Sequence, residues 1–371
     1  MNIYILDIDI KTPLLIADSL IGNVIKVTRY PYIPASTIRG AILSKLYREY
    51  KIKEVNIESS NPSFSIRPAY PVVNGLITKP PHKLMYRCKL CHKEERVILD
   101  KIFNSKNTLR NFNYENYYPP YKCQNGHVFS ISEVKSLVYL KMINGKWRYI
   151  EYSPDIIQIE SIGINRGIGG TEIGMLYSYI ALKPGLKYRT LIHDDIGRLD
   201  EWIKNLPKTD DYFIGRSISR GMGLCRISIK ETDTDEYIKK RKEKIREIIK
   251  YLDGLLILRA LSPILSFSNN GLTYKINLTN IGLKPHPIYK NYNYIPTQPI
   301  LIKGFSISKY VLPKIAIKGL GPGTLYFYEV SEDLDRVSEK IAKLELKGFS
   351  PPYNIGLNIL EVYDDVKYII H

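Results

Sequence analysis

Long hydrophobic runs are absent from this chain of 371 residues. The apolar stretch GLLILRALSPIL is broken by Arg259 and Pro263, so it falls short of the roughly 18 residues that a membrane-spanning helix needs. The first segment, MNIYILDIDIKTP, has no basic leader and carries Asp7 and Asp9 within its apolar run, which favours a β-strand over a signal peptide. We therefore expect a cytoplasmic protein with no membrane partner.

Cysteine is also scarce, with four residues in the chain. Three of them cluster, as the pair Cys88-x2-Cys91 and as Cys123. In the segment CQNGH, Cys123 is followed by a histidine in the spacing Cys123-x3-His127. In a reducing compartment such clustering suits a metal better than disulfides. Two turns with a ligand pair each supply four ligands to one tetrahedral Zn²⁺ and leave no position for water. The spacing therefore predicts a structural zinc site.

Other interpretations of these residues stay open. The cysteines and the histidine can be incidental, and His82 and His92 are reserve ligands. Cys225 lies in an expected strand and is most simply a small buried hydrophobic residue.

Familiar catalytic motifs are missing as well. The sequence contains no GxSxG, HExxH or paired-carboxylate pattern, and no GKS or GKT follows its glycine-rich segments as a Walker A loop requires. His193, in IHDDIG, is the histidine outside the cysteine region that has acidic neighbours, so it is a candidate general base. A histidine in a polar turn is the more common interpretation.

Positive charge, in contrast, is abundant. The chain has 54 Lys and Arg against 37 Asp and Glu, a net charge of +17, which favours an extended anionic partner such as nucleic acid. Residues 61–150 hold 15 Lys and Arg and 5 Asp and Glu, a net +10, and lack clean periodicity. We interpret them as a basic insertion. Its tyrosines can stack on unpaired bases or form a packing layer around the metal site; these are Tyr114, Tyr117, Tyr118 and Tyr121.

A helix that follows a proline-anchored turn is expected from Thr37 onward. Residues 3–10 alternate as a half-buried strand, a loop follows, and from Thr37 apolar residues recur at helical spacing. Arg39, Lys45 and Arg48 are expected on an opposite, cationic face. Ser36 or Thr37 is a natural N-cap, and the free amides of the first turn can hold a phosphate.

Two glycine-rich segments add further candidates. In GRSISRGMG, Gly215, Gly221 and Gly223 allow the backbone to approach a phosphate while Arg216 and Arg220 supply charge-assisted contacts. A glycine-loosened hairpin with solvated arginines is the alternative. In GINRGIGGTEIG, Asn165 and Arg166 directly precede the three glycines of GIGG, a weaker signal.

The order of these patterns suggests two related α+β units in tandem, because a glycine-rich segment precedes a β-rich run in both halves. We predict an N-terminal unit over 1–232 interrupted by the insertion 61–150, a helical linker over 233–252 and a C-terminal unit over 253–371.

Three segments of the sequence resemble motifs of the RAMP superfamily of CRISPR systems. YIPASTIRGAI resembles the helix start of that family, GINRGIGGTEIGMLYSYIALKPG its mid-domain segment, and GRSISRGMGLCRI its glycine-rich loop. The resemblance implies two tandem ferredoxin-like (RRM-like) domains. Within the family, the cysteine-bearing insertion is most similar to the type III-D subunits grouped with the crRNA 5′-handle-binding subunits.

This resemblance implies a structural role without catalysis. The subunit would bind the crRNA 5′ handle, cap the backbone and contact other RAMP backbone subunits and the large signalling subunit, meeting target RNA only indirectly. The expected RNA contacts are Ser36, Thr37, Arg39, Gly40, Asn165, Arg166, Gly215, Arg216, Arg220, Gly221 and Gly223.

One departure from the family bears on catalysis. Target-cleaving RAMPs carry an aspartate in the loop before the helix start, whereas residues 22–34 contain no carboxylate and Asp18 lies upstream. Binding is therefore favoured over cleavage. The alternatives are an endoribonuclease that cleaves target RNA through Asp18 or processes crRNA through His193, and a general RNA-binding protein outside CRISPR.

Overall fold

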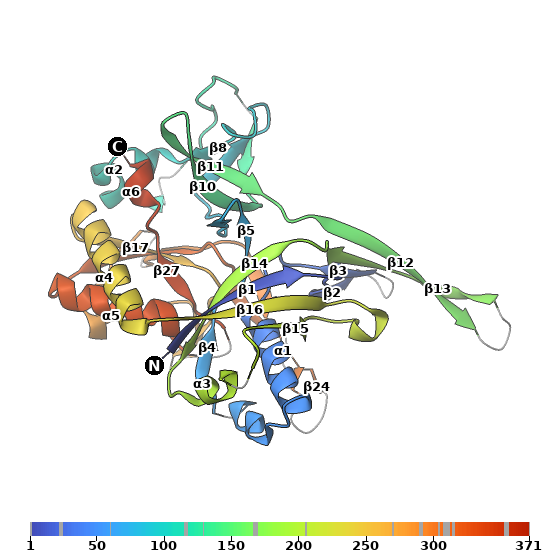
Figure 1. The fold of residues 1–371 in the computed structure, drawn as a ribbon. Helices are drawn as coiled ribbons and strands as arrows, with labels where there is room; N and C mark the ends of the chain where they lie inside the picture. The colour runs from blue at the N-terminus through green and yellow to red at the C-terminus, as the bar shows by residue number, and fades with distance from the viewer. Residues whose placement is uncertain are drawn as a thin grey trace. The chain divides into compact units, whose positions relative to one another are not determined.

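A computed structural model describes residues 2–21, 25–59, 61–114, 118–128, 130–165, 170–204, 206–268, 271–288, 292–302, 305–306, 312–313, 316–351 and 356–370. Helices and several separate sheets alternate along it, which confirms the predicted α+β class (Figure 1). The chain divides into two compact units. The N-terminal unit comprises Tyr4–Ile77 and Ser153–Glu231, and the C-terminal unit comprises Met1–Ile3, Thr78–Tyr152 and Thr232–His371.

The N-terminal unit is built on a seven-stranded sheet of order β15-β16-β1-β14-β5-β6, with β4 paired to β14. Its core includes the buried faces of the first strand and of helix α1 (Ala35–Arg48), which the sequence predicted from residue 37. The strands are β1 (Asn2–Ile10), β4 (Phe64–Ile66), β5 (Tyr70–Val73), β6 (Leu76–Ile77), β14 (Lys187–Asp194), β15 (Thr209–Phe213) and β16 (Leu224–Thr232). The 3-10 helix η1 (Lys53–Ser59) and helix α3 (Arg198–Ile203) complete this layer.

A second, four-stranded sheet in the same unit has the order β12-β13-β3-β2. Strands β12 (Ile156–Asn165) and β13 (Gly170–Leu182) form a long antiparallel hairpin that runs beyond its shorter neighbours (Figure 1). The segment expected as a loop after the first strand instead supplies β2 (Ala17–Ile21) and β3 (Ile25–Thr28), and β3 pairs in parallel with β13. The two parallel strands are about 150 residues apart in sequence, so no local sequence pattern could predict their pairing.

The C-terminal unit contains a five-stranded sheet of order β20-β26-β17-β27, with β21 paired to β26. The strands are β17 (Leu255–Ala260), β20 (Leu283–Pro285), β21 (Tyr294–Ile295), β26 (Leu325–Val330) and β27 (Leu360–Val362). The smaller elements are β18 (Ser266–Ser268), β19 (Gly271–Thr273), η5 (Thr279–Ile281), β22 (Pro299–Ile302), β23 (Phe305–Ser306), β24 (Leu312–Pro313), β25 (Ile317–Leu320) and α6 (Val366–Ile369).

Helix α4 (Thr234–Tyr251) belongs to this unit and is not a separate linker. It buries Ile245, Ile248 and Ile249 in the core and pairs through Arg241 with Glu345 of helix α5 (Leu334–Lys347). An amphipathic helix with an apolar stripe has to cover that stripe, and the neighbouring sheet provides the surface. The helix itself was predicted correctly, whereas its role as a connector was not.

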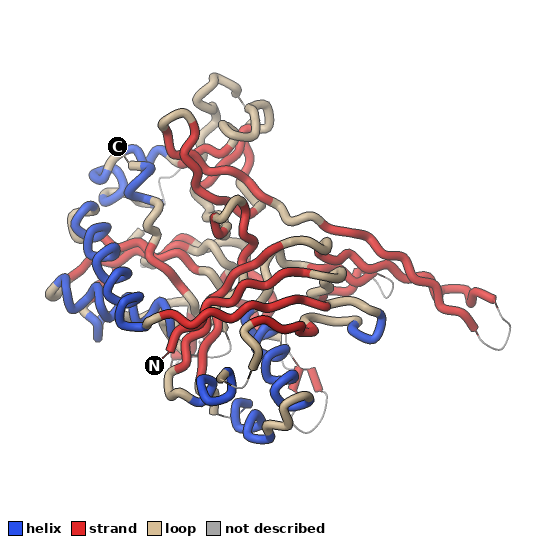
Figure 2. The backbone as a smooth tube through the Cα atoms, in the orientation of Figure 1, coloured by secondary structure: helices blue, strands red, loops and turns tan. Residues whose placement is uncertain are grey.

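The basic insertion packs with the C-terminal unit, over Thr78–Tyr152 and not over 61–150 within the N-terminal unit. Its Leu84, Phe103 and Leu109 join the core of residues that follow 232, because the insertion has little core of its own. Figure 2 shows how much of it is loop. Its elements are β7 (Met85–Cys88), β8 (Val97–Leu99), η2 (Lys101–Asn104), α2 (Lys106–Arg110), β9 (Ile131–Glu133), β10 (Leu137–Ile143) and β11 (Lys146–Tyr152).

Candidate nucleic-acid interface and metal site

The glycine-rich turn between β15 and β16 packs so closely that two of its positions accept only glycine. Gly215 has a φ of +86°, and a Cβ there would lie 2.5 Å from the carbonyl oxygen of Leu15. Gly223 has a φ of +84°, and its Cβ would lie 2.3 Å from the oxygen of Ile214. These glycines therefore fix the turn against the sheet. Gly221, with a φ of +77°, ends the 3-10 helix η4 (Ile218–Arg220) and has open space around it.

Arg220 projects from this turn onto the tyrosines of strand β13. Its guanidinium carbon lies 4.7 Å from the ring centroid of Tyr177 and 5.5 Å from that of Tyr179, and it donates a hydrogen bond to the Tyr179 hydroxyl. The ammonium of Lys26, on β3, lies 5.7 Å from the Tyr179 ring centroid. The arginine remains exposed, so its charge is held in place and still faces solvent.

Arg216 extends the same charged surface. Its backbone amide donates to the carbonyl of Leu15 at 3.0 Å, and the residue is exposed. Asn165 is the last residue of β12 and pairs with Gly170, whereas Arg166 lies outside the described residues.

The start of helix α1 differs from the prediction at its cap. The N-cap is Pro34, which makes no side-chain cap, so the expectation of Ser36 or Thr37 in that position is wrong. Proline has a fixed φ and is tolerated at the start of a helix. With Pro34 as the N-cap, Ser36 and Thr37 lie in the first turn of the helix. Ser36 and Gly40 are exposed there, and a Cβ at Gly40 would meet no atom within 4 Å.

Arg39 does not lie on an exposed cationic face, so that prediction from the sequence is wrong. The residue is 7% exposed, its Nη1 donates to the carbonyl of Phe64 at 2.6 Å, and its Nη2 pairs with the buried carboxylate of Glu58. Burial lowers the pKa of Arg39, while Glu58 opposes that change. Arg39 recurs with Ala35, Ile42 and Leu46 at core spacing, so it links α1 to η1 and β4 and is not available to a phosphate.

Lys45 was also expected on that face, and it too is buried. Its ammonium pairs with Asp210 at 2.7 Å and donates to the carbonyl of Asp211 at 2.6 Å. Arg48 is the member of the predicted face that remains exposed.

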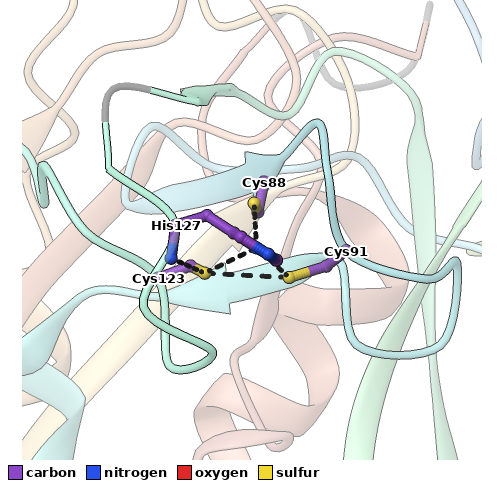
Figure 3. A group of neighbouring side chains, drawn as sticks. All are labelled: Cys88, Cys91, Cys123 and His127. Carbon is purple, nitrogen blue, oxygen red and sulfur yellow. Dashed lines mark hydrogen bonds between the residues drawn. The ribbon is translucent and has the colours of Figure 1, made fainter.

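The four predicted metal ligands come together in the insertion (Figure 3). All their ligand atoms lie within 4.8 Å of one another. The sulfurs of Cys91 and Cys123 are 3.7 Å apart, and Nδ1 of His127 lies 3.4 Å from each of them and 3.5 Å from the sulfur of Cys88. A tetrahedral zinc with bonds of about 2.3 Å to sulfur and 2.0 Å to nitrogen separates its ligands by about 3.8 and 3.5 Å. The donor set therefore fits such an ion.

The protonation of these thiols also favours a cation. Burial opposes ionisation of Cys88, but hydrogen bonds from Ser130 and from backbone amides lower its pKa to about 6. Burial and the neighbouring sulfurs of Cys88 and Cys123 raise the pKa of Cys91 to about 11. A positive ion beside the sulfur of Cys91 would favour its thiolate and so oppose the rise in its pKa.

The other cysteine and the reserve histidines lie elsewhere. Cys225 is buried in β16, and burial raises the pKa of its thiol to about 12, as expected of a small core residue. His82 is buried, with Nε2 3.0 Å from the hydroxyl of Tyr363, and His92 is exposed outside the cluster.

Of the four tyrosines considered above, the three that the structure describes are not among the residues packed with the cysteines, whereas Tyr86 of β7 is. Tyr114 packs against the core of the C-terminal unit, 6.2 Å from Phe112 between ring centroids. Tyr118 and Tyr121 are exposed, and Tyr117 lies outside the described residues.

The two candidate catalytic residues lie in different settings. Asp18 is in β2, where the pairing with β3 shifts register between Ala17 and Ser19. His193 is 6% exposed within β14, with Nδ1 3.3 Å from a carboxylate oxygen of Asp195. It therefore does not lie in a polar turn, which was the more common interpretation of the sequence.

The sequence analysis did not single out Lys26, Tyr177 or Tyr179. A signal was present, since Tyr177 and Tyr179 alternate within a strand and so lie on one face. The residue that joins them to the glycine-rich turn, Arg220, is distant in sequence, and pairing of the two segments is what the sequence could not show.

Comparison with known proteins identifies the family. The chain matches the model of the RAMP superfamily over residues 7–226, more than half its length, and it belongs to that superfamily, as predicted. No curated protein matches it.

Among solved structures, a type III-B Cmr-beta complex bound to cognate target RNA and AMPPnP contains a chain that is 12% identical, with 87% of this chain and 86% of that one covered and a TM-score of 0.46. A chain of a Csm3-Csm4 subcomplex in a type III-A CRISPR-Cas interference complex is 11% identical, with 90% of this chain and 93% of that one covered and a TM-score of 0.37. Oligomeric Cmr4 from Pyrococcus furiosus is 14% identical, with 62% of this chain and 99% of that one covered and a TM-score of 0.29.

None of the helices in the described parts of the chain is long and apolar enough to cross a membrane.

Proposed function

We propose that this chain is an RNA-binding structural subunit of a type III CRISPR effector complex that holds the 5′ handle of the crRNA and caps the backbone. Membership of the RAMP superfamily and the net charge of +17 support an RNA partner. The observation that carries the proposal is the exposed arginine pair at the glycine-rich turn, with Arg220 held over Tyr177 and Tyr179 beside Lys26.

These residues have the chemistry of a single-strand backbone site. Arginines on a turn whose backbone is fixed by Gly215 and Gly223 present charge-assisted donors without losing much side-chain freedom on binding. The helix start with exposed Ser36 and Gly40, and the hairpin end at Asn165 with Arg166, are proposed as further contacts. We interpret each compact unit as a variant of the ferredoxin-like fold.

The test is binding of fluorescent RNA to Arg216→Glu/Arg220→Glu. The affinity for RNA with the repeat-derived handle should fall at least about tenfold, and the slope of log affinity against log salt should decrease by about 1.4, because two phosphate contacts are lost. Lys240→Glu/Lys343→Glu, which makes the same charge change on exposed residues of α4 and α5, is the matched control.

Two outcomes would contradict the proposal. Equal losses in the arginine variant and the control would mean that net charge, not this site, attracts RNA. Equal affinity for handle RNA and a scrambled RNA of the same length would favour a general RNA-binding protein.

We further propose that the chain binds RNA without cleaving it. The burial of His193 supports this for crRNA processing. Incubation with repeat RNA and with a guide-target duplex, with and without Mg²⁺, tests it, and specific cleavage that Asp18→Ala or His193→Ala abolishes would show an endoribonuclease instead.

Zinc is the ion that we propose for the cluster of Cys88, Cys91, Cys123 and His127. Three thiolates and an imidazole are typical of structural zinc, and four protein ligands leave no place for a reacting water. Bound zinc would join the two turns of the insertion and thereby stabilise a region of irregular backbone.

A further inference from the structure

The two metal-binding turns, defined here as residues 88–93 and 118–128, carry the most exposed large hydrophobic side chains among the described residues. Tyr118 is 87% exposed, and Tyr121 and Leu90 are each 67% exposed. Side chains with so little burial add little to folding. A cluster of them on one small module marks a binding surface more often than chance exposure does.

Backbone contacts place the two turns at one end of the insertion. Lys122 bridges Val128 in an antiparallel pair, and the amide of Cys123 donates to the carbonyl of His127 at 3.0 Å. The amide of Lys89, in the first turn, donates to the carbonyl of Ser130 at 2.9 Å, just beyond the second turn. The ligand atoms of both turns converge within 4.8 Å, so the two turns that carry the exposed side chains meet at the ligand cluster.

The charge at this end is positive. Lys89, Lys93 and Lys122 are exposed, and residues 88–93 and 118–128 contain no carboxylate. Two carboxylates follow the first turn: that of Glu94 is exposed, and that of Glu95 is bound by Arg148 at 3.0 Å and by the side-chain amide of Asn125 at 3.1 Å. Exposed aromatic rings interleaved with lysines suit an anionic chain that also offers flat apolar faces, which describes unpaired RNA.

We propose that the metal-binding turns form a stacking platform for single-stranded RNA, with Tyr118 and Tyr121 against bases and Lys89 and Lys122 beside phosphates. The inference rests on RNA as the partner in the proposed function, but it concerns a different set of residues, which belong to the C-terminal unit. The proline pair between the two tyrosines restricts the backbone, so the rings lose little freedom when a base stacks on them.

The experiment measures fluorescence anisotropy of an unstructured single-stranded RNA and of the same RNA in a duplex, using the full chain. Tyr118→Ala and Tyr121→Ala should each weaken single-strand binding by about fivefold to a hundredfold. Phenylalanine at either position should restore it, because stacking needs the ring and not the hydroxyl. Duplex binding should change much less, since its bases are already stacked.

Metal removal gives a second readout. A chelator should lower single-strand affinity by a similar factor, and added Zn²⁺ should restore it, because the turns lose their common centre without the ion.

The matched control for the two tyrosine variants is Tyr47→Ala, at a residue 49% exposed on α1, which should bind single-stranded RNA normally.

The outcomes separate this inference from the proposed function. Unchanged single-strand affinity in Tyr118→Ala/Tyr121→Ala would overturn the stacking platform. If that variant binds RNA normally but fails to assemble with other subunits, the surface is a protein interface instead. Equal loss for duplex would overturn stacking. If Arg216→Glu/Arg220→Glu binds normally while the tyrosine variant does not, the proposed function fails and the platform stands.

Discussion

At the scale of single residues, Arg39 shows how a charge can hold a helix in place. Its guanidinium lies 4.0 Å from the ring centroid of Phe64 and pairs with Glu58, a carboxylate that also accepts from Arg198 at 2.9 Å. Removing Arg39 would leave the buried carboxylate of Glu58 with Arg198, which is partly exposed, as its cationic partner, and loss of one partner of a buried pair costs more than the pair itself contributes. The arginine is therefore a determinant of folding.

Arg39→Ala should destabilise the protein by about 3–5 kcal/mol, because the carboxylate of Glu58 stays buried. Urea denaturation measures this. Arg48→Ala, at an exposed position on the same helix, should change the free energy of unfolding by less than about 0.5 kcal/mol. If Arg39→Ala keeps full stability and loses only RNA affinity, the phosphate contact expected from the sequence would be right after all.

The glycines of the 215–223 turn allow a comparison between steric clash and backbone strain. Gly223→Ala places a Cβ against the oxygen of Ile214 and should both destabilise the N-terminal unit and weaken RNA binding. Gly221→Ala keeps a positive φ in open space, so it should cost only about 1 kcal/mol. Thermal unfolding of the two variants checks the order, and equal effects would show that the close approach at Gly223 is not required.

At the scale of secondary-structure elements, local patterns predicted what local interactions form. Apolar spacing located α1 and α4, and alternation located β1, because the period of each pattern is that of the element. The pairing of β3 with β13 depends on residues distant in sequence and was missed. The assignment of Arg39 to a solvent face failed because a charged residue at a core position is rare and looks like a surface residue.

The candidate site divides in the same way. The cluster of four candidate metal ligands was predictable because each turn carries its pair within a few residues. Arg220 was predicted from its glycine neighbours. Tyr177, Tyr179 and Lys26 were not predicted, because only the folded sheets bring these distant residues together.

For the metal-binding turns, we expect about one zinc per chain by elemental analysis of the purified protein. Cys123→Ser should lose it, because the ion keeps only three ligands. Cys225→Ala, which removes the thiol outside the cluster, should retain the metal, and it is the matched control for loss of a buried cysteine. Equal metal content in the two variants would contradict the ligand set.

At the scale of the whole molecule, the two compact units are each assembled from separate stretches of chain. In the C-terminal unit a buried polar cluster joins the insertion to the last strand. Glu361 accepts from Arg259 at 2.8 Å and pairs with Lys79, and the hydroxyls of Tyr149 and Tyr363 are 2.8 Å apart. The boundaries of the two compact units follow contacts that only the folded chain makes.

This cluster should make stability depend on acid. Burial would raise the pKa of Glu361, but Lys79 and Arg259 lower it from 4.5 to about 2. Between these values the unfolded chain binds more protons than the folded one, so stability should decrease as pH falls from about 4.5 to 2. Urea midpoints against pH measure this. Glu361→Gln should flatten the dependence, and exposed Glu243→Gln should not.

The interleaved order of the C-terminal unit has a consequence for biosynthesis. Residues 78–152 leave the ribosome long before the helices and strands after residue 232 that complete their core. At about 5–20 residues per second, the apolar side chains of Leu84 and Phe103 wait on the order of ten seconds or more for their partners. The metal turns can close as soon as His127 emerges, which would give this nascent segment one fixed point while translation continues.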